Sequence, residues 1–219
     1  MNDPGIQPRS VLIVDDHPIV QQGLSQLINA EDDLEVSGNA ATVEEALQSL
    51  CDSDPDVVIV DLSLAHSDGL ELVKEIRKEA RHLPVLVLSM HDENMYAERL
   101  LSAGANGYIM KQAAADQLLI ALRRVLAGGV YVSEHLGASM IERIAGNDPK
   151  QTSNPIERLS NRELQVLNLI GRGKTTREVA ENLTLSVKTV ESHRQRIKKK
   201  LNLQTSAQLV QFAVSSYAQ

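Results

Sequence analysis

Residues 10–128 alternate short apolar runs with stretches in which apolar residues recur at helical spacing. Most of the runs are rich in branched residues and some are apolar throughout, which is typical of strands covered on both faces. Between the runs, apolar positions recur every three or four residues, as at Val20, Leu24 and Leu27. Five successive strand–helix units predict an α/β fold, a doubly wound parallel sheet with helices on both faces. The predicted strands contain residues 11–14, 34–37, 57–60, 85–88 and 107–110.

The pattern changes after residue 128. Gly128 and Gly129 end the last helix of the first block, and a short amphipathic segment follows at about residues 134–144. A stretch rich in Gly, Pro and Asn comes next, and from Ser160 onward the pattern is helical without strand-like alternation. The predicted organisation is a disordered lead at 1–9, an α/β domain at 10–128, a linker with a short helix at 129–158 and a helical domain at 159–219.

Charge divides the chain in the same way. Residues 1–150 hold 24 acidic and 11 basic residues, a net charge of −13, and residues 151–219 hold 5 acidic and 11 basic residues, a net charge of +6. The two blocks account for the net charge of −7 of the whole chain. An acidic block joined to a basic one indicates two domains with different partners.

The single cysteine, Cys51, excludes an internal disulfide framework and a multi-cysteine zinc site. It favours a reducing, cytoplasmic setting, and we expect Cys51 to pack as a small apolar residue near the end of the second helix. No apolar run approaches the roughly 18–20 residues that span a bilayer, and the first ten residues lack the regions of a signal peptide. We therefore expect no membrane partner.

Polar residues with related chemistry occur where the predicted strands end. Asp15 and Asp16 follow the first strand and Asp61 follows the third. If these strands are neighbours, the three carboxylates meet at the edge of the sheet where ligand sites of such folds lie. Clustered carboxylates repel one another and need a cation, and oxygen ligands suit Mg²⁺. A single acid at a strand end could be only a helix N-cap, but the further presence of Ser89 and Lys111 at the next two strand ends favours a phosphoryl-binding site.

The segments VLIVDDHPIV, VVIVDLSLAHSDGLEL, VLVLSMHDE and GANGYIMKQA resemble the receiver domain of two-component response regulators over about residues 10–128. This resemblance implies a flavodoxin-like sheet of strand order 2-1-3-4-5. It implies that Asp61 accepts a phosphoryl group from a sensor histidine kinase. It also implies a Mg²⁺ site formed by Asp15, Asp16, Asp61 and the backbone carbonyl of Ser63.

The resemblance also assigns the residues around the phosphoryl group. Ser89 would bind this group, Lys111 would pair with it, and Tyr108 would be the aromatic residue that turns inward on activation. Two positions depart from the family pattern. The family usually has proline four residues after the phospho-acceptor, where this chain has Ala65, and Met90 is bulkier than the small residue often found there. Ala65 is the one feature in favour of an alternative regulator that works without phosphorylation.

A second alternative comes from another family. The strand that ends at Asp15 also resembles the nucleophile strand of aspartate-dependent phosphohydrolases. Those enzymes have a second aspartate two residues later as general acid, whereas this chain has His17. We therefore favour a regulator over an enzyme. His17 is expected to open the first helix with Pro18 in its first turn, and a role as metal ligand is the alternative.

The basic block carries an amphipathic helix, predicted from a cap at Ser186 to about Leu201. At 100° per residue, Val190 and Ile197 lie on one face and a polar stripe lies on the other. A charged face of an isolated helix is usually only solvated. Here the tight turn before the helix and the local charge of +6 favour DNA binding, since cationic residues neutralise phosphates and amides or hydroxyls reach base edges. The polar stripe comprises Lys188, Ser192, Gln195 and Lys199.

Residues 156–216 resemble the LuxR/NarL-type helix-turn-helix through Leu159-Ser-x-Arg-Glu163, Glu178-Val-Ala180 and Ser186-Val-Lys-Thr-Val190. The resemblance implies a small all-α domain of four helices that binds double-stranded DNA. It implies dimerisation through a last helix at 206–216. The implied DNA contacts are Lys188, Thr189, Ser192, Arg196 and Lys199.

Two points stay open at this stage. Leu209, Val210 and Ala213 of the last helix are candidates for the dimer contact, but they could equally form the core of a monomer. Glu191 either weakens attraction to phosphates or accepts a hydrogen bond from a cytosine amino group, so the base preference is undetermined. The predicted function is a transcriptional regulator in which phosphorylation of Asp61 releases a masked helix-turn-helix to bind promoter DNA as a homodimer.

Overall fold

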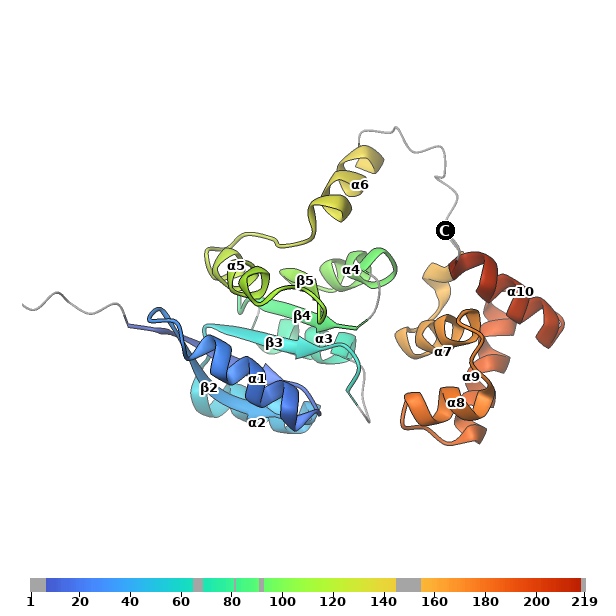
Figure 1. Ribbon diagram of the computed structural model, residues 1–219, viewed down its shortest axis with the longest axis horizontal. Helices are drawn as coiled ribbons and strands as arrows, with labels where there is room; N and C mark the ends of the chain where they lie inside the picture. The colour runs from blue at the N-terminus through green and yellow to red at the C-terminus, as the bar shows by residue number, and fades with distance from the viewer. Residues whose placement is uncertain (1–6, 65–68, 81, 91–92, 145–154, 218–219) are drawn as a thin grey trace, which may run out of the picture. The chain divides into compact units, whose positions relative to one another are not determined.

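The computed structural model describes residues 7–64, 69–80, 82–90, 93–144 and 155–217. The chain forms two compact units, residues 1–145 and 146–219, and each is described by itself (Figure 1). The first unit contains, in chain order, β1 (Arg9–Val14), α1 (Pro18–Ile28), β2 (Leu34–Ala40), α2 (Val43–Ser53), β3 (Val57–Asp61), α3 (Gly69–Glu79), β4 (Val85–Ser89), α4 (Glu93–Ser102), β5 (Gly107–Met110), α5 (Ala115–Leu126) and α6 (Glu134–Ile144).

The five strands form one parallel sheet of order β2-β1-β3-β4-β5. This arrangement confirms the predicted fold class and strand order. Helices α1 and α5 pack on one face of the sheet through a shared apolar cluster that includes Ile28, Leu118 and Leu122. Strands β3 and β4 are buried along their whole length, which explains why their sequences are continuous apolar runs and do not alternate.

The prediction for Cys51 is wrong, because its side chain is exposed. Ala46 is the buried residue of α2, and a position five residues later lies about 140° around a helix. Cys51 therefore points away from the face that Ala46 packs against the sheet.

The chain after α5 returns to the sheet. Tyr131 forms an isolated parallel bridge with Gly107, and the Tyr108 amide donates to the Tyr131 carbonyl at 3.0 Å. Ser133 then begins α6, because its hydroxyl accepts from the Leu136 amide, and the same hydroxyl bonds the carboxylate of Glu93 at the start of α4. The helix expected at about 134–144 therefore exists and is attached to β5 and α4, within the stretch interpreted as a linker.

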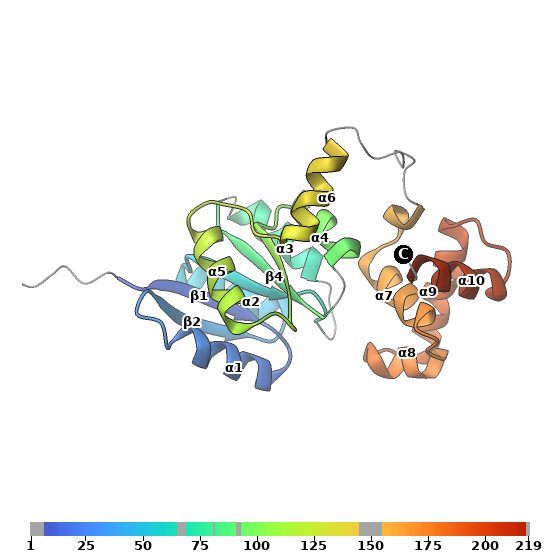
Figure 2. The same ribbon diagram turned by 45° about the horizontal axis from the view of Figure 1, so that its top comes forward.

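The second unit contains η1 (Pro155–Arg158) and four α-helices among its described residues (Figure 2). A capping box is present at the start of the first of them, where Ser160 and Glu163 exchange hydrogen bonds. Gly173, with φ of +78°, follows the end of this helix in a conformation that favours glycine. The helices are α7 (Asn161–Gly171), α8 (Thr176–Asn182), α9 (Val187–Lys200) and α10 (Ser206–Tyr217).

Helix α10 answers one of the two open questions in part. Leu209 and Ala213 are buried in the second unit, whereas Val210 and Val214 are 43% and 48% exposed. Two of the three candidates for a dimer contact are thus core residues, and Val210 remains available with Val214 one turn later. Across the described residues, no helix has both the length and the apolar character that a membrane crossing requires.

Candidate functional site

The carboxyl edge of the sheet brings five predicted residues together. Asp15 follows β1, Asp61 ends β3, Ser89 ends β4 and Lys111 follows β5. Asp15, Asp61 and Ser89 are buried, and Asp16 is largely buried beside them. Lys111 Nζ lies 2.6 Å from Asp15 Oδ2 and 3.0 Å from Asp61 Oδ2. The Lys111 amide also donates to the Ser89 carbonyl at 2.7 Å, which fixes the lysine backbone to the end of β4.

The charges of this site strongly influence one another. Burial raises the pKa of Asp61, and the nearby Asp15 carboxylate raises it further, while Lys111 works in the opposite direction without cancelling the effect. Burial alone would lower the pKa of Lys111, but the two carboxylates outweigh burial and the pKa of Lys111 is raised. The lysine is therefore held as a cation between two buried acids.

The same edge offers ligands for a divalent cation. One ligand atom from each of Asp15, Asp16, His17 and Asp61 can be chosen so that all four lie within 4.8 Å of one another. Two buried oxygens, Asp16 Oδ1 and Asp61 Oδ2, accept no hydrogen bond among the described residues, although His17 Nδ1 and Lys111 Nζ lie within ion-pair distance of them. Such oxygens fit a hard cation such as Mg²⁺, so the residues present suit the ion that the sequence implied.

The backbone around Asp61 adds contacts that the sequence did not indicate. The Ser63 amide donates to Asp61 Oδ1 at 3.1 Å, while the predicted role of the Ser63 carbonyl as a metal ligand stays a prediction. A Cβ atom at Gly69 would lie 2.4 Å from the Asp61 carbonyl oxygen, so only glycine allows α3 to begin this close to the acceptor strand. The signal for Gly69 was a glycine at a helix start, where it lowers helix propensity without an evident reason. Ala65 lies outside the described residues.

Tyr108 lies on β5 next to this edge, and its side chain is fully buried. Met90, by contrast, is 55% exposed immediately after Ser89, so its bulk points largely into solvent. The assignment of Tyr108 as a switch residue stays a prediction.

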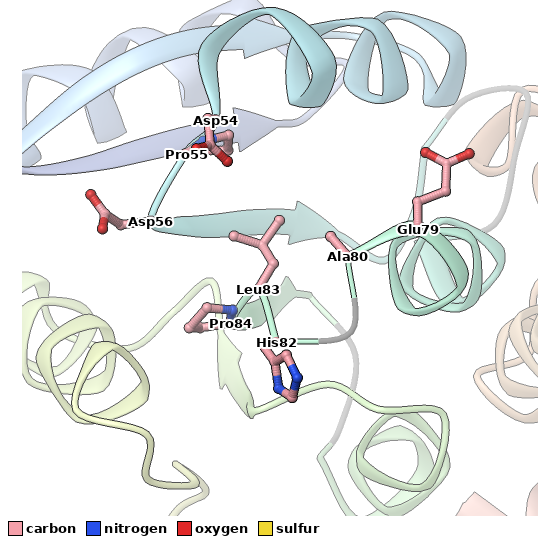
Figure 3. A pocket seen from close by; sticks show the side chains of 8 residues that line it. All are labelled: Asp54, Pro55, Asp56, Glu79, Ala80, His82, Leu83 and Pro84. Carbon is pink, nitrogen blue, oxygen red and sulfur yellow. The ribbon is translucent and has the colours of Figure 1, made fainter.

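The opposite end of the sheet holds a groove formed where β3 and β4 begin (Figure 3). Its polar lining includes Asp54, Asp56, Glu79 and His82. The Asp56 carboxylate already accepts hydrogen bonds from Arg9 at 2.7 Å and from the Ser10 amide at 2.9 Å. Asp56 therefore ties β1 to the start of β3 and has a structural role.

Helix α9 has the two faces that its sequence predicted. Val190 and Ile197 are buried, and the other face presents exposed polar side chains. Thr189 is half-buried, and its hydroxyl lies 2.7 Å from that of the capping residue Ser186. The four other predicted DNA contacts, Lys188, Ser192, Arg196 and Lys199, are exposed.

Three polar contacts link α9 to the helices beside it. Glu191 Oε1 accepts a hydrogen bond from Thr176 Oγ1 at 3.2 Å, and Arg194 donates to the same hydroxyl at 3.3 Å, which links α9 to the start of α8. At the other end, Lys200 Nζ donates to the buried Glu163 carboxylate at 2.6 Å. Glu191 thus has a partner inside the domain, a contact that its sequence position did not reveal.

Comparison with known families agrees with this geometry. Residues 11–123 match the response regulator receiver domain, and residues 157–213 match the bacterial regulatory proteins of the luxR family. The chain belongs to the two-component response regulators that join a receiver domain to a LuxR-type DNA-binding domain. This membership confirms the predicted class, a DNA-binding transcription regulator.

The chain is similar to particular members of this class. It is 38% identical over 208 residues to the oxygen regulatory protein NreC of Staphylococcus carnosus (strain TM300), which covers 93% of this chain and 96% of that protein. It is 39% identical, with the same coverage, to NreC of Staphylococcus aureus (strain bovine RF122 / ET3-1).

Solved structures show the same likeness. RcsB of Salmonella enterica serovar Typhimurium, bound to promoter rprA in the presence of the phosphomimetic BeF₃⁻, has a TM-score of 0.61 and 27% identity, covering 95% of this chain and 99% of that one. A two-component response regulator of the LuxR family from Aurantimonas sp. has a TM-score of 0.59 and 30% identity, covering 64% of this chain and 99% of that one.

Proposed function

We propose that Asp61 accepts a phosphoryl group from the phosphohistidine of a sensor kinase, and that this increases the affinity of the chain for promoter DNA as a homodimer. The observation that carries the proposal is the buried group of Asp15, Asp61 and Lys111 at one edge of the sheet, with Lys111 Nζ within 3.0 Å of both carboxylates. A bacterial regulator that binds promoter DNA works in the cytoplasm, and we propose this location for the protein.

The chemistry follows from the positions of these groups. A carboxylate oxygen of Asp61 attacks the phosphorus in line, a P–O bond forms as the P–N bond to the donor histidine breaks, and the imidazole leaves with the electron pair. Asp15, Asp16 and Asp61 would hold a divalent cation, which would supply positive charge to offset the charge of the phosphoryl oxygens. Lys111 and Ser89 then hold the new phosphoryl group by charge and hydrogen bonding.

The transmission step starts at Lys111. Its ammonium now contacts Asp61 directly, and a phosphoryl dianion on Asp61 attracts the same ammonium more strongly. Because the Lys111 amide is bound to the Ser89 carbonyl, a shift of the lysine moves the adjoining ends of β4 and β5. We assign Tyr108, buried on β5, as the side chain that responds to this shift.

The output rests on the second unit. Exposed Lys188, Ser192, Arg196 and Lys199 of α9 supply the phosphate and base contacts in this proposal. The solved RcsB structures, which include a complex with promoter DNA and two dimers bound to two DNAs, support DNA binding as a dimer. The chain itself transfers a signal and is not an enzyme in this proposal.

The test uses the full chain with acetyl phosphate and Mg²⁺. Intact mass reports the phosphoryl group, and anisotropy reports binding to a DNA site selected from a random pool. Wild type and the control Asp116→Asn, at an exposed aspartate of α5, gain the phosphoryl mass and bind DNA more tightly after the reaction. Asp61→Asn gains neither.

Equal DNA affinity with and without the phosphoryl group would remove the switch and leave DNA binding in place. Turnover of a phosphomonoester that needs Asp15 and not Asp61 would instead support the phosphohydrolase.

A further inference from the structure

We propose that His17 is a nitrogen ligand of the cation site, and that it makes this receiver prefer first-row transition-metal dications over Mg²⁺. The inference rests on the proposed function, because it assumes that a cation occupies the edge formed by Asp15, Asp16 and Asp61. It goes further by assigning a fourth side chain and a different class of metal. Imidazole nitrogen suits metals such as Co²⁺ and Ni²⁺, whereas Mg²⁺ prefers oxygen ligands and water.

The backbone holds the His17 ring over the carboxylates. The His17 amide donates to Asp15 Oδ1 at 2.9 Å, and α1 begins directly afterwards with Pro18 in its first turn. Within this turn, His17 Nδ1 lies 3.1 Å from Asp15 Oδ1 and 2.8 Å from Asp16 Oδ1. The side chain makes no capping hydrogen bond to α1, so its ring nitrogen is directed at the acids and not at the helix.

The candidate ligand atoms lie close enough together to share one ion after small shifts. Metal–ligand bonds of 2.0–2.1 Å place adjacent ligands about 3.0 Å apart and opposite ligands about 4.2 Å apart. The two distances from His17 Nδ1, 2.8 and 3.1 Å, are those of adjacent ligands, and the four-residue group spans at most 4.8 Å. Small side-chain shifts therefore bring the nitrogen and the oxygens onto one ion.

Lys111 and His17 face different oxygens of Asp15, because Lys111 contacts Oδ2 and His17 faces Oδ1. At Asp61, Lys111 contacts Oδ2, so a cation bound through that oxygen would share it with the lysine. The His17 side chain is 60% exposed, which leaves solvent access to the ion on that side. Hydrogen bonding and metal ligation exclude one another at Nδ1, because a ring nitrogen that donates its proton to a carboxylate has no lone pair for a metal. Metal binding must therefore replace the present His17 contacts, and this replacement is measurable.

The experiment uses the unphosphorylated full chain with Co²⁺ and, separately, Mg²⁺. Equilibrium dialysis gives the affinity for each ion, and proton NMR of the Co²⁺ form detects the exchangeable N–H of a ligating imidazole far outside the normal range. His17→Asn is the test variant because Asn still suits a helix N-cap. His135→Ala, at an exposed histidine of α6, is the matched control.

We expect wild type and His135→Ala to show the shifted N–H signal and to bind Co²⁺ more tightly than Mg²⁺. His17→Asn loses the signal and on the order of tenfold in Co²⁺ affinity, while its Mg²⁺ affinity changes much less. The same loss for both ions, or no shifted signal in wild type, overturns the inference. If wild type still binds Mg²⁺ and is phosphorylated at Asp61, the proposed function stands without it. If wild type binds neither ion, both this inference and the proposed function are wrong.

Discussion

Lys111 Nζ lies 2.6 Å from Asp15 Oδ2, although the two residues are 96 positions apart in the chain. The contact links the residue that follows β1 to the residue that follows β5, at the carboxyl edge of the sheet. It also places a cation beside Asp61, whose own carboxylate lies 3.0 Å from the same ammonium. The charge balance of the site therefore depends on one side chain.

Replacing Lys111 by a neutral residue should preserve phosphorylation of Asp61 but remove its effect on DNA binding. In Lys111→Met, Asp61 still accepts phosphate from acetyl phosphate, but the gain in DNA affinity on phosphorylation falls below about twofold, because nothing pulls β5 toward the phosphoryl group. Intact mass and DNA anisotropy measure the two steps, and thermal unfolding verifies that the variant is folded. The control Lys78→Met removes an exposed lysine of α3 and keeps the full gain. A full gain in Lys111→Met would show that the lysine does not transmit the signal.

The raised pKa of Asp61 predicts how Asp61→Asn affects stability in buffer without divalent cations. Because the pKa of Asp61 is higher in the folded chain than in the unfolded chain, protonation favours folding. This contribution is complete below the unfolded pKa and is lost as the pH rises through the folded pKa. We expect Asp61→Asn to be more stable than wild type at neutral pH, with a difference that shrinks as the pH falls. Thermal unfolding of both proteins across pH measures the difference, and Asp116→Asn gives the baseline.

Gly69 and Gly23 form a matched pair for testing the close approach of α3 to Asp61. A Cβ at Gly69 would meet the Asp61 carbonyl oxygen at 2.4 Å, whereas a Cβ at Gly23 meets nothing within 4 Å. Gly69→Ala should destabilise the first unit by about 1–3 kcal/mol through overpacking against backbone. Gly23→Ala, inside α1, should stabilise it by about 1 kcal/mol through helix propensity. Denaturant unfolding measures both, and a neutral Gly69→Ala would show that α3 can move away without cost.

In the second unit, the pair of Glu163 and Lys200 carries stability that depends on pH. Burial works to raise the pKa of Glu163, but hydrogen bonds from Lys200 and from the Ser160 backbone outweigh it, and the pKa is lowered. The stability from Glu163 is therefore present above its unfolded pKa and is lost as the pH falls through the lower folded pKa. Glu163→Gln should cost about 2 kcal/mol at neutral pH.

Denaturant unfolding gives the size of this effect, and hydrogen exchange of α7 and α9 locates it. Glu181→Gln is the control, because its ion pair with Arg177 is solvent-exposed on both sides and exposed pairs contribute little. Equal losses of unfolding free energy in the two variants would mean that the Glu163–Lys200 contact stabilises the unit no more than an exposed ion pair does.

The cationic face of α9 predicts how DNA affinity depends on salt concentration. Lys199→Ala should weaken DNA binding by a similar factor for all sequences, and the slope of log affinity against log salt should decrease by about one. Anisotropy titrations at several salt concentrations, on a selected site and on an unrelated duplex, measure both quantities. Lys78→Ala removes an exposed lysine from the first unit and leaves the slope unchanged. A loss confined to the selected site would make Lys199 a base-reading residue.

Most element positions were predictable because buried strands and amphipathic helices leave strong periodic signals, whereas the strand order was implied only by the resemblance to receiver domains. Strand β2 was predicted only as far as Ser37 but extends to Ala40. Its later part carries polar Ser37 and Asn39 at exposed positions, as an outer strand of a sheet allows. Cys51 was misplaced because a single residue carries no periodic signal of its own.

The site residues at strand ends were predictable because parallel strands bring their carboxyl ends to one edge. The polar contacts between helices of the second unit were not predictable. The contact between Glu163 and Lys200 joins positions 37 apart, and the contact between Thr176 and Glu191 depends on the angle between two helices. Neither leaves a pattern along the chain, since both arise only from tertiary packing.

The return of Tyr131 to the sheet has a consequence for how the receiver unit associates with other chains. Strand β5 is the last strand of the sheet on its side, and an open outer strand is a template for pairing with another chain. Here the Tyr131 carbonyl accepts from the Tyr108 amide, and the Tyr131 amide donates to the Asn106 carbonyl. The segment that leaves the receiver unit thus shields its outer strand, and a fragment truncated at the end of α5 would expose it to self-association.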